Sequence, residues 1–481
     1  MKKVLLTGSA LLAFAAAGFA QSNTTTTVQT GSSQTARQQQ TGNYLTSIIS
    51  QDQTTQRNVG NFAATRQEST GEAGNTAIVR QDVGSLGNRG YVTQVGGTGN
   101  VGSITQSNGS GESPLQVTDG TRQQTVRAQG GNWADLYQQG SNNRDVTINQ
   151  SNVSKANLAT ITQYANGSRQ TKIEQSTTSV SNEARINQGT TGEAAINVAA
   201  SIQQSGISQK NKGLITQAGE GSVGSIAQNN SSTGNEATIT QISGAAYENA
   251  TIVQSDISRA NKASVTQSSM GDVAKVNQTN TSGENQATIL QTGTGSDGAT
   301  INQQFNAQNN QATIEQLGGN SNATINQQYN ARMNAATVRQ NGYDNTAGIN
   351  QINSISSTAT INQNLSSPAN SGNVAQVNQG EQAGNSSVGN LAVVTQESSQ
   401  NQARLLQVGT SNLATLSQTG NNNIIRAADG SAGSFATQRG TTNTLSITQD
   451  SGSGGVYVPN IANVTQLGTG NMATIIQTGR N

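Results

Sequence analysis

The side chains that most often carry out catalysis or hold metal ions are scarce in this sequence. It contains no Cys and no His in 481 residues, so thiolate nucleophiles, imidazole bases and the commonest zinc ligands are all missing. Its 24 Asp and Glu residues are scattered between apolar strand positions and in turns, with no recurring pair suited to acid–base chemistry. The sequence therefore predicts a protein that is not an enzyme, with no catalytic, cofactor-binding or metal-binding residues and no small-molecule substrate.

One glycine-rich segment has the spacing of a phosphate-binding loop. GTGSDG, residues 293–298, matches G-x-G-x-x-G, which in a dinucleotide site follows a strand and opens a helix. Here the strand-like run ATINQ follows, so we interpret the segment as a turn. Trp133 and most tyrosines stand singly, which argues against an aromatic platform for nucleic acid or sugar. The net charge of +1 provides no field that would attract nucleic acid, and we expect no nucleic-acid partner.

The side chains that do recur at fixed spacing are amides. Asn and Gln bracket a phrase, N-x-A-x-[IV]-x-Q, that returns along most of the chain, for example as NQATILQ from Asn285 and NMATIIQ from Asn471. The fixed residues of the phrase occupy every second position, so their side chains would lie on one face of a strand. Such alternation over seven residues indicates a strand with one buried face. A side-chain amide has both a donor and an acceptor, so a column of Gln can form hydrogen bonds along its length as the backbone does.

The closing glutamines of the phrase set the period of the repeat. They are 11 to 13 residues apart, and the segment from Gln303 aligns with the segment from Gln327. The unit is therefore two strands with their turns, and it cannot bury its apolar face unless units stack. Gly and Asn in QLGG, QNGYDN and QVGTSN suit turns that need positive φ. The sequence predicts an all-β fold, a parallel β-solenoid of stacked strand–turn–strand repeats that form two facing sheets of a cross-β, amyloid-like kind.

Three segments are predicted along the chain. Residues 1–20 have a positive start, an apolar stretch and small residues, as a secretory signal peptide does, with cleavage after Ala20 or Ala17. Residues 21–57 are polar and lack the phrase, so we expect a flexible leader, and residues 58–481 form the repeat solenoid. The rival interpretation is a disordered Gln- and Asn-rich chain, since only 31% of residues are hydrophobic. A disordered chain has no reason to keep Ala and Ile at one parity.

The most regular units resemble a known family. The pattern Q-x-G-x-x-N-x-A-x-x-x-Q occurs from Gln340, Gln407 and Gln466, and it resembles the curlin repeat of the curli fibre subunits. The likeness extends over most of residues 58–481. Many units here are spaced by 12 or 13 residues instead of 11, and Asn often stands where curlin repeats begin with Ser. The signal peptide and polar leader also resemble that family, in which the leader guides the chain to an outer-membrane export channel.

The resemblance assigns roles to particular residues. It implies that the stacked amides carry polymerisation. The alternation and the turn chemistry assign the apolar positions to the core and the glycines to the turns. The expected ladder residues are Asn310, Gln316, Gln327, Gln340, Asn345, Gln351, Gln407, Asn412, Gln418, Gln466, Asn471 and Gln477. The expected core residues are Ile314, Ile325, Val338, Ile349 and Ile475, and the expected turn residues are Gly318, Gly342, Gly409 and Gly468.

Two classes of function are compatible with these patterns. The first is a secreted structural protein that self-assembles into curli-like extracellular amyloid fibres for biofilm matrix and surface adhesion, as a fibre subunit or a nucleator. Its partners would be copies of itself, related curlin-repeat subunits and the secretion channel, at the surface of a bacterium with an outer membrane. The alternative is a monomeric β-solenoid that binds a surface or ice through an outer Thr-rich face, formed by Thr238, Thr288, Thr300, Thr313, Thr324, Thr337, Thr360, Thr415 and Thr474.

Overall fold

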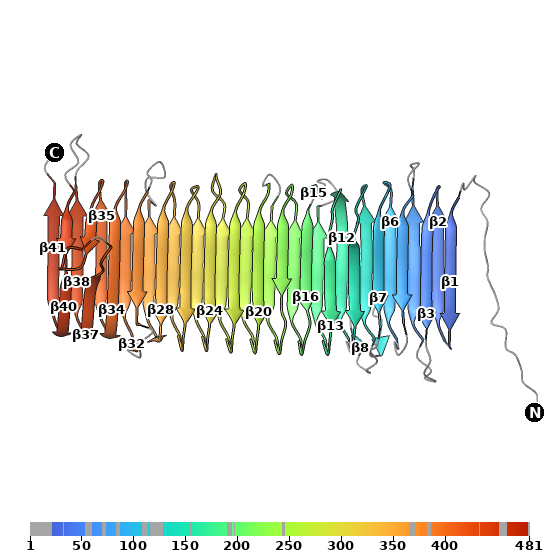
Figure 1. The fold of residues 1–481 in the computed structure, drawn as a ribbon, viewed down its shortest axis with the longest axis horizontal. Helices are drawn as coiled ribbons and strands as arrows, with labels where there is room; N and C mark the ends of the chain where they lie inside the picture. Colours follow the sequence, from blue (N-terminus) through green and yellow to red (C-terminus); the bar gives the residue numbers. More distant parts are fainter. Residues whose placement is uncertain are drawn as a thin grey trace, which may run out of the picture.

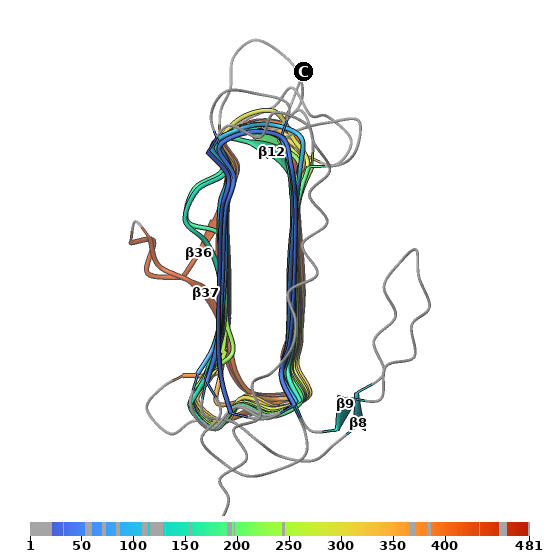
Figure 2. The same cartoon turned by 90° about the vertical axis from the view of Figure 1, so that its right-hand side faces the viewer.

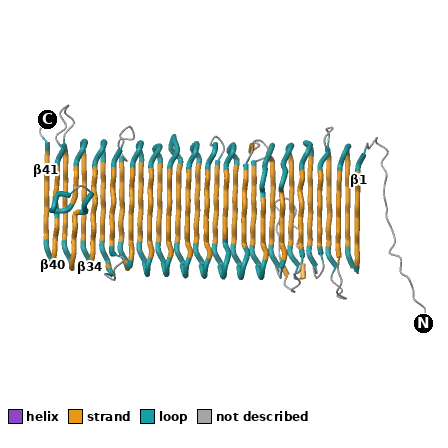
Figure 3. The backbone as a smooth tube through the Cα atoms, viewed as in Figure 1, coloured by secondary structure: helices purple, strands orange, loops and turns teal. Residues whose placement is uncertain are grey.

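The chain folds into a rod of stacked strands with no helix among the residues that the structure describes (Figures 1 and 3). A computed structural model describes residues 22–31, 33–52, 60–69, 74–82, 87–107, 114–115, 128–129, 131–152, 156–189, 195–196, 198–242, 246–364, 372–381, 386–431, 433–451 and 459–479. Seen along the rod, the backbone forms two facing walls joined by turns at both ends (Figure 2). The predicted all-β parallel solenoid with two sheets is confirmed.

One wall, named sheet A, consists of parallel strands that pair in chain order. Each pairing joins strands from successive coils, so the sheet grows by one strand per coil. Its main strands are β1 (Thr24–Thr30), β3 (Thr46–Asp52), β5 (Thr76–Gln81), β7 (Val101–Gln106), β11 (Val146–Ser151), β13 (Lys172–Ser176), β16 (Ala199–Gln204), β18 (Val223–Ala227), β20 (Asn249–Ser255), β22 (Val273–Thr279), β24 (Gly298–Gln304), β26 (Asn322–Gln328), β28 (Thr346–Ile352), β31 (Val374–Gln379), β34 (Gln402–Thr410), β37 (Ala436–Thr441) and β40 (Thr465–Thr469).

The facing wall, named sheet B, is built in the same way from the alternate strands. These also pair in parallel and in chain order. Its main strands are β2 (Thr35–Thr41), β4 (Phe62–Glu68), β6 (Arg89–Val95), β10 (Trp133–Gln139), β12 (Leu158–Asn166), β14 (Glu183–Gln188), β17 (Lys212–Gln217), β19 (Glu236–Gln241), β21 (Lys262–Gln267), β23 (Gln286–Gln291), β25 (Gln311–Gln316), β27 (Ala335–Gln340), β30 (Thr358–Gln363), β33 (Leu391–Gln396), β35 (Leu413–Thr419), β38 (Thr444–Asp450) and β41 (Met472–Thr478).

Seven shorter strands lie at turns or insertions. β8 (Pro114–Leu115) and β9 (Ala128–Gln129) form a small antiparallel pair. β15 (Ala195–Ile196) pairs with the end of β12, and β29 (Ser354–Ile355) pairs with β32 (Ser387–Val388). β36 (Ile424–Arg426) and β39 (Ile461–Asn463) extend the rungs of β37 and β40.

The alternation of apolar and polar residues in the sequence explains why each strand has one buried face. In β25, QATIEQ, the side chains of Ala312, Ile314 and Gln316 are buried, while the intervening residues are exposed or partly exposed. The same pattern recurs in most strands of both sheets, so the core is a narrow band of Ala and Ile or Val between the two walls. Because side chains alternate in a strand, this one-sided burial follows from the parity of the phrase.

The two long interruptions in the repeat do not break the coil. Strand pairing passes directly from β7 to β11 and from β6 to β10, across the stretch between residues 107 and 131. Farther along, the chain leaves sheet A after β36 and returns as β37, and this excursion projects from the wall in Figure 2. Both β36 and β37 pair with β34, so the insertion lies within a single rung.

The structure differs from the predicted boundary between leader and solenoid. Three strands lie within residues 21–57, and β3 pairs in register with β5, with Gln51 opposite Gln81. The phrase is present there in an altered form, since Ser47 stands where later strands have Ala. In β1, the corresponding positions hold Thr25 and Thr27. A search for the apolar phrase misses strands whose inward positions are polar. The predicted signal peptide, residues 1–20, lies outside the described residues.

Candidate functional site

The most continuous chemical feature inside sheet B is a column of buried glutamines. In the middle of the rod, the Nε2 of Gln316 donates to the Oε1 of Gln340 over 3.0 Å, and Gln340 donates in turn to Gln363 over 2.8 Å. Most of these side chains have no exposed surface. The bonded series, in chain order, is Gln40, Gln67, Gln94, Gln138, Gln163, Gln188, Gln217, Gln241, Gln267, Gln291, Gln316, Gln340, Gln363, Gln396, Gln418, Gln449 and Gln477.

Sheet A contains a matching column. Gln327 donates to Gln351 over 2.8 Å, and Gln407 donates to Gln438 over 2.9 Å. The series runs through Gln29, Gln51, Gln81, Gln106, Gln150, Gln175, Gln204, Gln228, Gln254, Gln278, Gln303, Gln327, Gln351, Gln379, Gln407, Gln438 and Gln466. In both columns each amide donates to the glutamine of the next coil, so the ladders have a direction from the N-terminal to the C-terminal end.

Many of the glutamines also bond to the turn that leads to the opposite sheet. The Nε2 of Gln316 donates to the backbone carbonyl of Ser321 over 2.9 Å and to that of Gly298 over 3.1 Å. A buried amide is costly to remove from water unless it is hydrogen-bonded, and these bonds satisfy it. The glutamines therefore hold successive coils in register and connect the two sheets at the same time.

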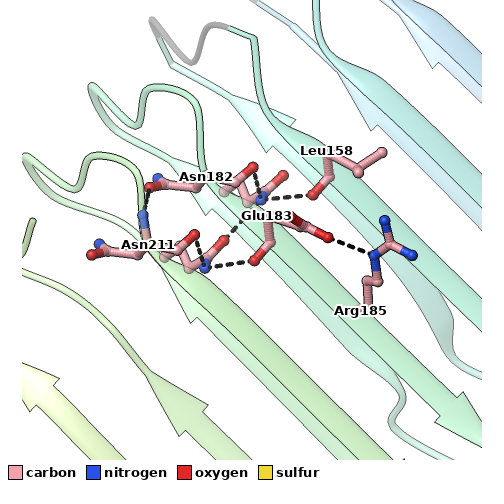
Figure 4. A network of polar contacts seen from close by, with 7 residues as sticks. Leu158, Asn182, Glu183, Arg185 and Asn211 are labelled. Carbon is pink, nitrogen blue, oxygen red and sulfur yellow. Dashed lines mark hydrogen bonds and ion pairs between the residues drawn. The ribbon is translucent and has the colours of Figure 1, made fainter. Parts of the chain in front are cut away.

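A second kind of ladder is formed by the asparagines that begin the phrase. In Figure 4 the Oδ1 of Asn182 accepts the backbone N–H of Asn211 over 2.9 Å, while the Asn211 carbonyl accepts the N–H of Glu183 over 2.8 Å. Arg185 lies on the outer side of the same strand and contacts Glu183 at 2.7 Å. Within one Asn, the backbone bonds to the neighbouring rung on one side and the side-chain oxygen bonds to the rung on the other side. Such an Asn therefore links three consecutive coils.

The predicted Asn positions lie in these ladders. Asn310 accepts from the backbone of Asn334 over 3.0 Å, and Asn412 accepts from that of Asn443 over 3.1 Å. Asn345 belongs to sheet A, where its Oδ1 accepts the backbone N–H of Asn373 over 3.1 Å. Asn471 is in the last rung, and its N–H donates to Asn443 over 3.0 Å.

The predicted core residues line the band between the sheets. Ile314, Ile325, Val338 and Ile349 have no exposed surface. Ile475 packs against the same cluster but is only partly buried, because it belongs to β41, which pairs on one side only.

The predicted turn glycines serve two different purposes. Gly342, Gly409 and Gly468 have positive φ, as the turn interpretation expected. Gly318 does not; in its turn Asn320 takes positive φ instead. A Cβ on Gly318 would lie 1.7 Å from the carbonyl oxygen of Gly342 in the next coil, so close packing of stacked turns requires glycine there. Turns that stack this tightly tolerate few side chains.

The glycine-rich segment 293–298 is also a stacked turn. A Cβ on Gly293 would lie 1.5 Å from the carbonyl oxygen of Gly318, and Gly295 has a φ of 127°. The segment joins β23 to β24, both strands, as the sequence indicated.

Three of the acids that the sequence analysis placed among scattered carboxylates share one recurring position at the ends of turns. Glu248, Asp272 and Asp297 occupy the position that Asn holds in other rungs, and all three are buried. The register of the phrase could have revealed them, because each stands six residues before an inward Gln. Desolvation raises the pKa of Glu248 to about 8 and that of Asp297 to about 7, and it also raises the pKa of Asp272.

The prediction that aromatic residues stand singly is wrong near the N-terminal end of sheet B. Phe62 and Tyr91 have ring centroids 5.2 Å apart, and Tyr91 and Trp133 have centroids 5.3 Å apart. The guanidinium of Arg89 lies over the Trp133 ring at 5.7 Å. These residues come from β4, β6 and β10, and the long insertion before Trp133 hides their alignment in the sequence.

The threonines considered for a binding face divide between the two sheets. Thr300 and Thr324 lie on sheet A, and the other seven lie in a single outer column of sheet B. In that column Ser264, Val393 and Ser446 interrupt the threonines. The adjacent column contains Glu315 and Arg339, which form an ion pair of 3.2 Å, so the face is mixed in character.

Other kinds of site find no support in the described part of the chain. It contains no group of three or more acidic residues arranged to hold a metal ion. No helix within it is long and apolar enough to cross a membrane.

Comparisons with known proteins match the regular C-terminal units. Residues 388–420 and 399–426 match the model of the curlin associated repeat. These windows contain β33, β34 and β35, where Gln396, Gln407 and Gln418 occupy the ladders. Curated proteins give no match to the chain. The chain is therefore similar to curlin-repeat proteins in the part where its spacing is shortest, and its ladders extend the same stacking through both sheets.

Proposed function

We propose that this chain is a secreted structural protein that assembles end to end into curli-like extracellular amyloid fibres, as a fibre subunit or a nucleator. One observation carries the proposal: parallel strands stack in register along the rod, with two unbroken Gln columns and the same Asn, Ala and Ile or Val positions in most rungs. Such stacking of Gln, Asn, Ala and Ile is the arrangement of a cross-β fibre, here formed within one chain. A fibre continues the same stacking across molecules.

The end strands provide the chemistry for that continuation. Among the described residues, β40 and β41 pair on one side only, so their outer edges carry backbone groups without a strand partner. Gln466 and Gln477 accept ladder bonds from Gln438 and Gln449, and an added rung would receive the next bond of each ladder. The free edges of β1 and β2 lie at the opposite end of the rod (Figure 1).

Parallel strands make the assembly directional. The C-terminal edge of one copy and the N-terminal edge of another have matching strand direction, so stacking in this sense generates an open filament and not a closed dimer. We further propose that the N-terminal segment directs export through an outer-membrane channel and that the fibre serves biofilm matrix and adhesion. The curlin-repeat match and the predicted signal peptide support this placement.

The proposal is tested with purified protein lacking residues 1–20. We expect fibres that bind thioflavin T and give a cross-β reflection at about 4.7 Å along the fibre axis. Their growth should be seeded by preformed fibres, and fractionation of the producing cells should find the protein outside the outer membrane. A chain that stays monomeric at high concentration, with its solenoid folded, would contradict fibre assembly.

The outer threonine column of sheet B favours one alternative function. A monomeric solenoid that binds ice or another flat surface would use Thr313, Thr337 and their neighbours as an ordered array. An assay of ice recrystallisation with the monomer, and with a Thr313→Lys and Thr337→Lys variant, distinguishes this function. Inhibition by the parent alone would favour the binding function.

A further inference from the structure

The centre of sheet A contains a buried column of acids for which the repeat offers no explanation. In most rungs of this solenoid the phrase begins with Asn, but at five consecutive rungs of sheet A it begins with Ser222, Glu248, Asp272, Asp297 and Ser321. The three acids have at most 1% exposed surface. Neighbouring strands are about 4.8 Å apart, so three carboxyl groups stand one above another.

Only part of the Asn hydrogen-bonding pattern survives in this column. Asp272 accepts the backbone N–H of Asp297 over 3.0 Å, and Asp297 accepts that of Ser321 over 2.8 Å, as Asn would. Ser222 donates to the Oε2 of Glu248 over 3.2 Å, and Ser269 donates to Asp272. The Oε1 of Glu248 and the Oδ2 of Asp297 are buried and have no hydrogen-bond partner. In Asn or Gln, the atom at this position is the amide nitrogen, which carries N–H donors. In a protonated acid, it is the oxygen that carries the proton.

Within the described residues, no positive charge faces the column. The turns packed around it, residues 218–222, 246–248, 268–272, 292–297 and 317–321, contain Glu220 and Tyr247 as their only other titratable groups, and both are exposed. None of these described turns contains Lys or Arg.

The strands around the column place their charges elsewhere. Lys275 on β22 is at an exposed outward position, and so are Lys212, Glu236 and Lys262 on the facing sheet. The sheet B residues that reach the column are amides, such as Gln291, whose Nε2 donates to the Asp297 carbonyl over 2.9 Å. Ionised carboxylates in this place would therefore be desolvated and would repel one another without compensation.

We propose that Glu248, Asp272 and Asp297 form a proton-operated joint, in which neutral carboxyl groups continue the Asn ladder and ionised ones loosen the rungs between β18 and β26. In the neutral state an acid O–H replaces the amide N–H, so the column can remain closed. The joint belongs to the folded solenoid itself and does not depend on fibre assembly.

The direction of the pH effect follows from the raised pKa values. A group whose pKa is higher in the folded state binds its proton more tightly there, so folding stability is complete below the unfolded pKa and falls as the pH rises to the folded one. For Glu248 this window runs from 4.5 to about 8, and for Asp297 from 3.8 to about 7. Above the folded pKa the loss of folding stability is complete, and the stability no longer changes with pH.

The test is hydrogen exchange of the folded full-length mature chain, corrected for the intrinsic pH dependence of exchange. Between about pH 5 and pH 8 we expect protection of β20, β22 and β24 to fall by at least about 100-fold, while protection of β33 and β35 stays constant. In the Glu248→Gln, Asp272→Asn and Asp297→Asn triple variant the three strands should remain protected at both pH values. Glu315→Gln, on the outer face, is the matched control and should behave as the parent does.

Several outcomes would contradict the proposed joint. Protection of β20 to β24 that is independent of pH in the parent, or that falls equally in the triple variant, would remove the acids as its cause. Restoration of protection at about pH 8 by Ca²⁺ in the parent, but not in the triple variant, would show that the column binds a cation. Because exchange is read on the folded chain, each result is independent of whether fibres form.

Discussion

The two ends of the rod present different chemistry at equivalent positions. At the C-terminal end, Ala473 and Ile475 of β41 pack against the core and repeat the phrase of the internal rungs. At the N-terminal end, the corresponding inward position of β2 holds Gln38, opposite Thr65 of β4, where most later rungs have Ile, Val or Leu. β1 carries Thr25 and Thr27 in place of Ala and Ile. One end exposes an apolar rung, and the other exposes a polar one.

The polar rung is internally hydrogen-bonded. Thr27 donates from β1 to the Oε1 of Gln38 on β2 over 3.0 Å, and Gln38 donates to the Oγ of Ser47 over 3.0 Å. These bonds cross the space that Ile and Ala fill elsewhere, so the polar groups do not need a further rung to satisfy them. A polar outer rung is how solenoids blunt an end. If copies stack as proposed, we expect the C-terminal edge to bind an added strand more tightly than the N-terminal edge does.

The strongest test of this contrast removes the backbone donors of the C-terminal edge. In parallel pairing, alternate residues bond to opposite sides, and the carbonyl of Asn471 and the N–H of Gly479 bond to β38. The N–H groups of Thr474 and Ile476 therefore face the open edge. Thr474→Pro with Ile476→Pro should block elongation at this end, because Pro cannot donate to a ladder. Two-colour imaging of seeded fibres measures growth at each end separately.

The matched control moves the prolines by one residue. Ala473→Pro with Ile475→Pro would remove bonds to β38 instead and would release β41 from the rod. Growth could then resume on β38, so this variant should slow elongation less. Equal growth of the 474/476 variant and the parent at both ends would show that this edge is not used.

The sequence predicted the repeat well and the exceptions poorly, for one physical reason. Parity and spacing identify inward positions wherever Ala and Ile fill them, and the buried Ile314 and Gln316 follow directly. The pairing register of the strands, however, is set by backbone hydrogen bonds, which do not depend on the side chain. β1 obeys the register with unexpected side chains, and only the three-dimensional pairing shows it. The acid Asp297 also obeys the register, but it escapes a search for Asn and is found only by counting back six residues from Gln303. The contact of Tyr91 with Trp133 was missed because an insertion places these adjacent rungs far apart in sequence.

A second test makes the N-terminal rung resemble the C-terminal one. Thr27→Ile with Gln38→Ile removes both partners of one hydrogen bond, which is often neutral or stabilising. Ser47 loses the donor that Gln38 provides but keeps its hydrogen bond with Thr65. Across a junction between molecules, the new side chains would meet Val464 and Ile475, and a buried Ile contributes about 1.5–3 kcal/mol. We expect the fibre end to bind the variant roughly tenfold more tightly for each 1.4 kcal/mol gained. The critical concentration for fibre growth measures this, and an unchanged value would mean that β1 and β2 do not form the junction.

A third test interrupts the ladder that links the two ends. Gln340→Leu keeps a side chain of similar size but leaves Gln316 without its acceptor and Gln363 without its donor. The expected cost is about 1–3 kcal/mol in the free energy of unfolding, with slower fibre growth. Thr313→Val, at an outward position of β25, is the control and should change little. Chemical denaturation of the monomer measures both, and equal effects at the two positions would contradict the assigned register.

The smallest effect is expected on the outer face, which both ends share. Glu315 and Arg339 form an ion pair of 3.2 Å across β25 and β27, and their side chains are 31% and 52% exposed. Solvent screens a pair of this kind, so Glu315→Gln should cost no more than about 1 kcal/mol, and less in high salt. Fibre growth at each end should stay at the parent rate, since neither edge strand contains these residues. A loss as large as that of Gln340→Leu would mean that outer side chains, and not the inner ladders, hold the coils in register.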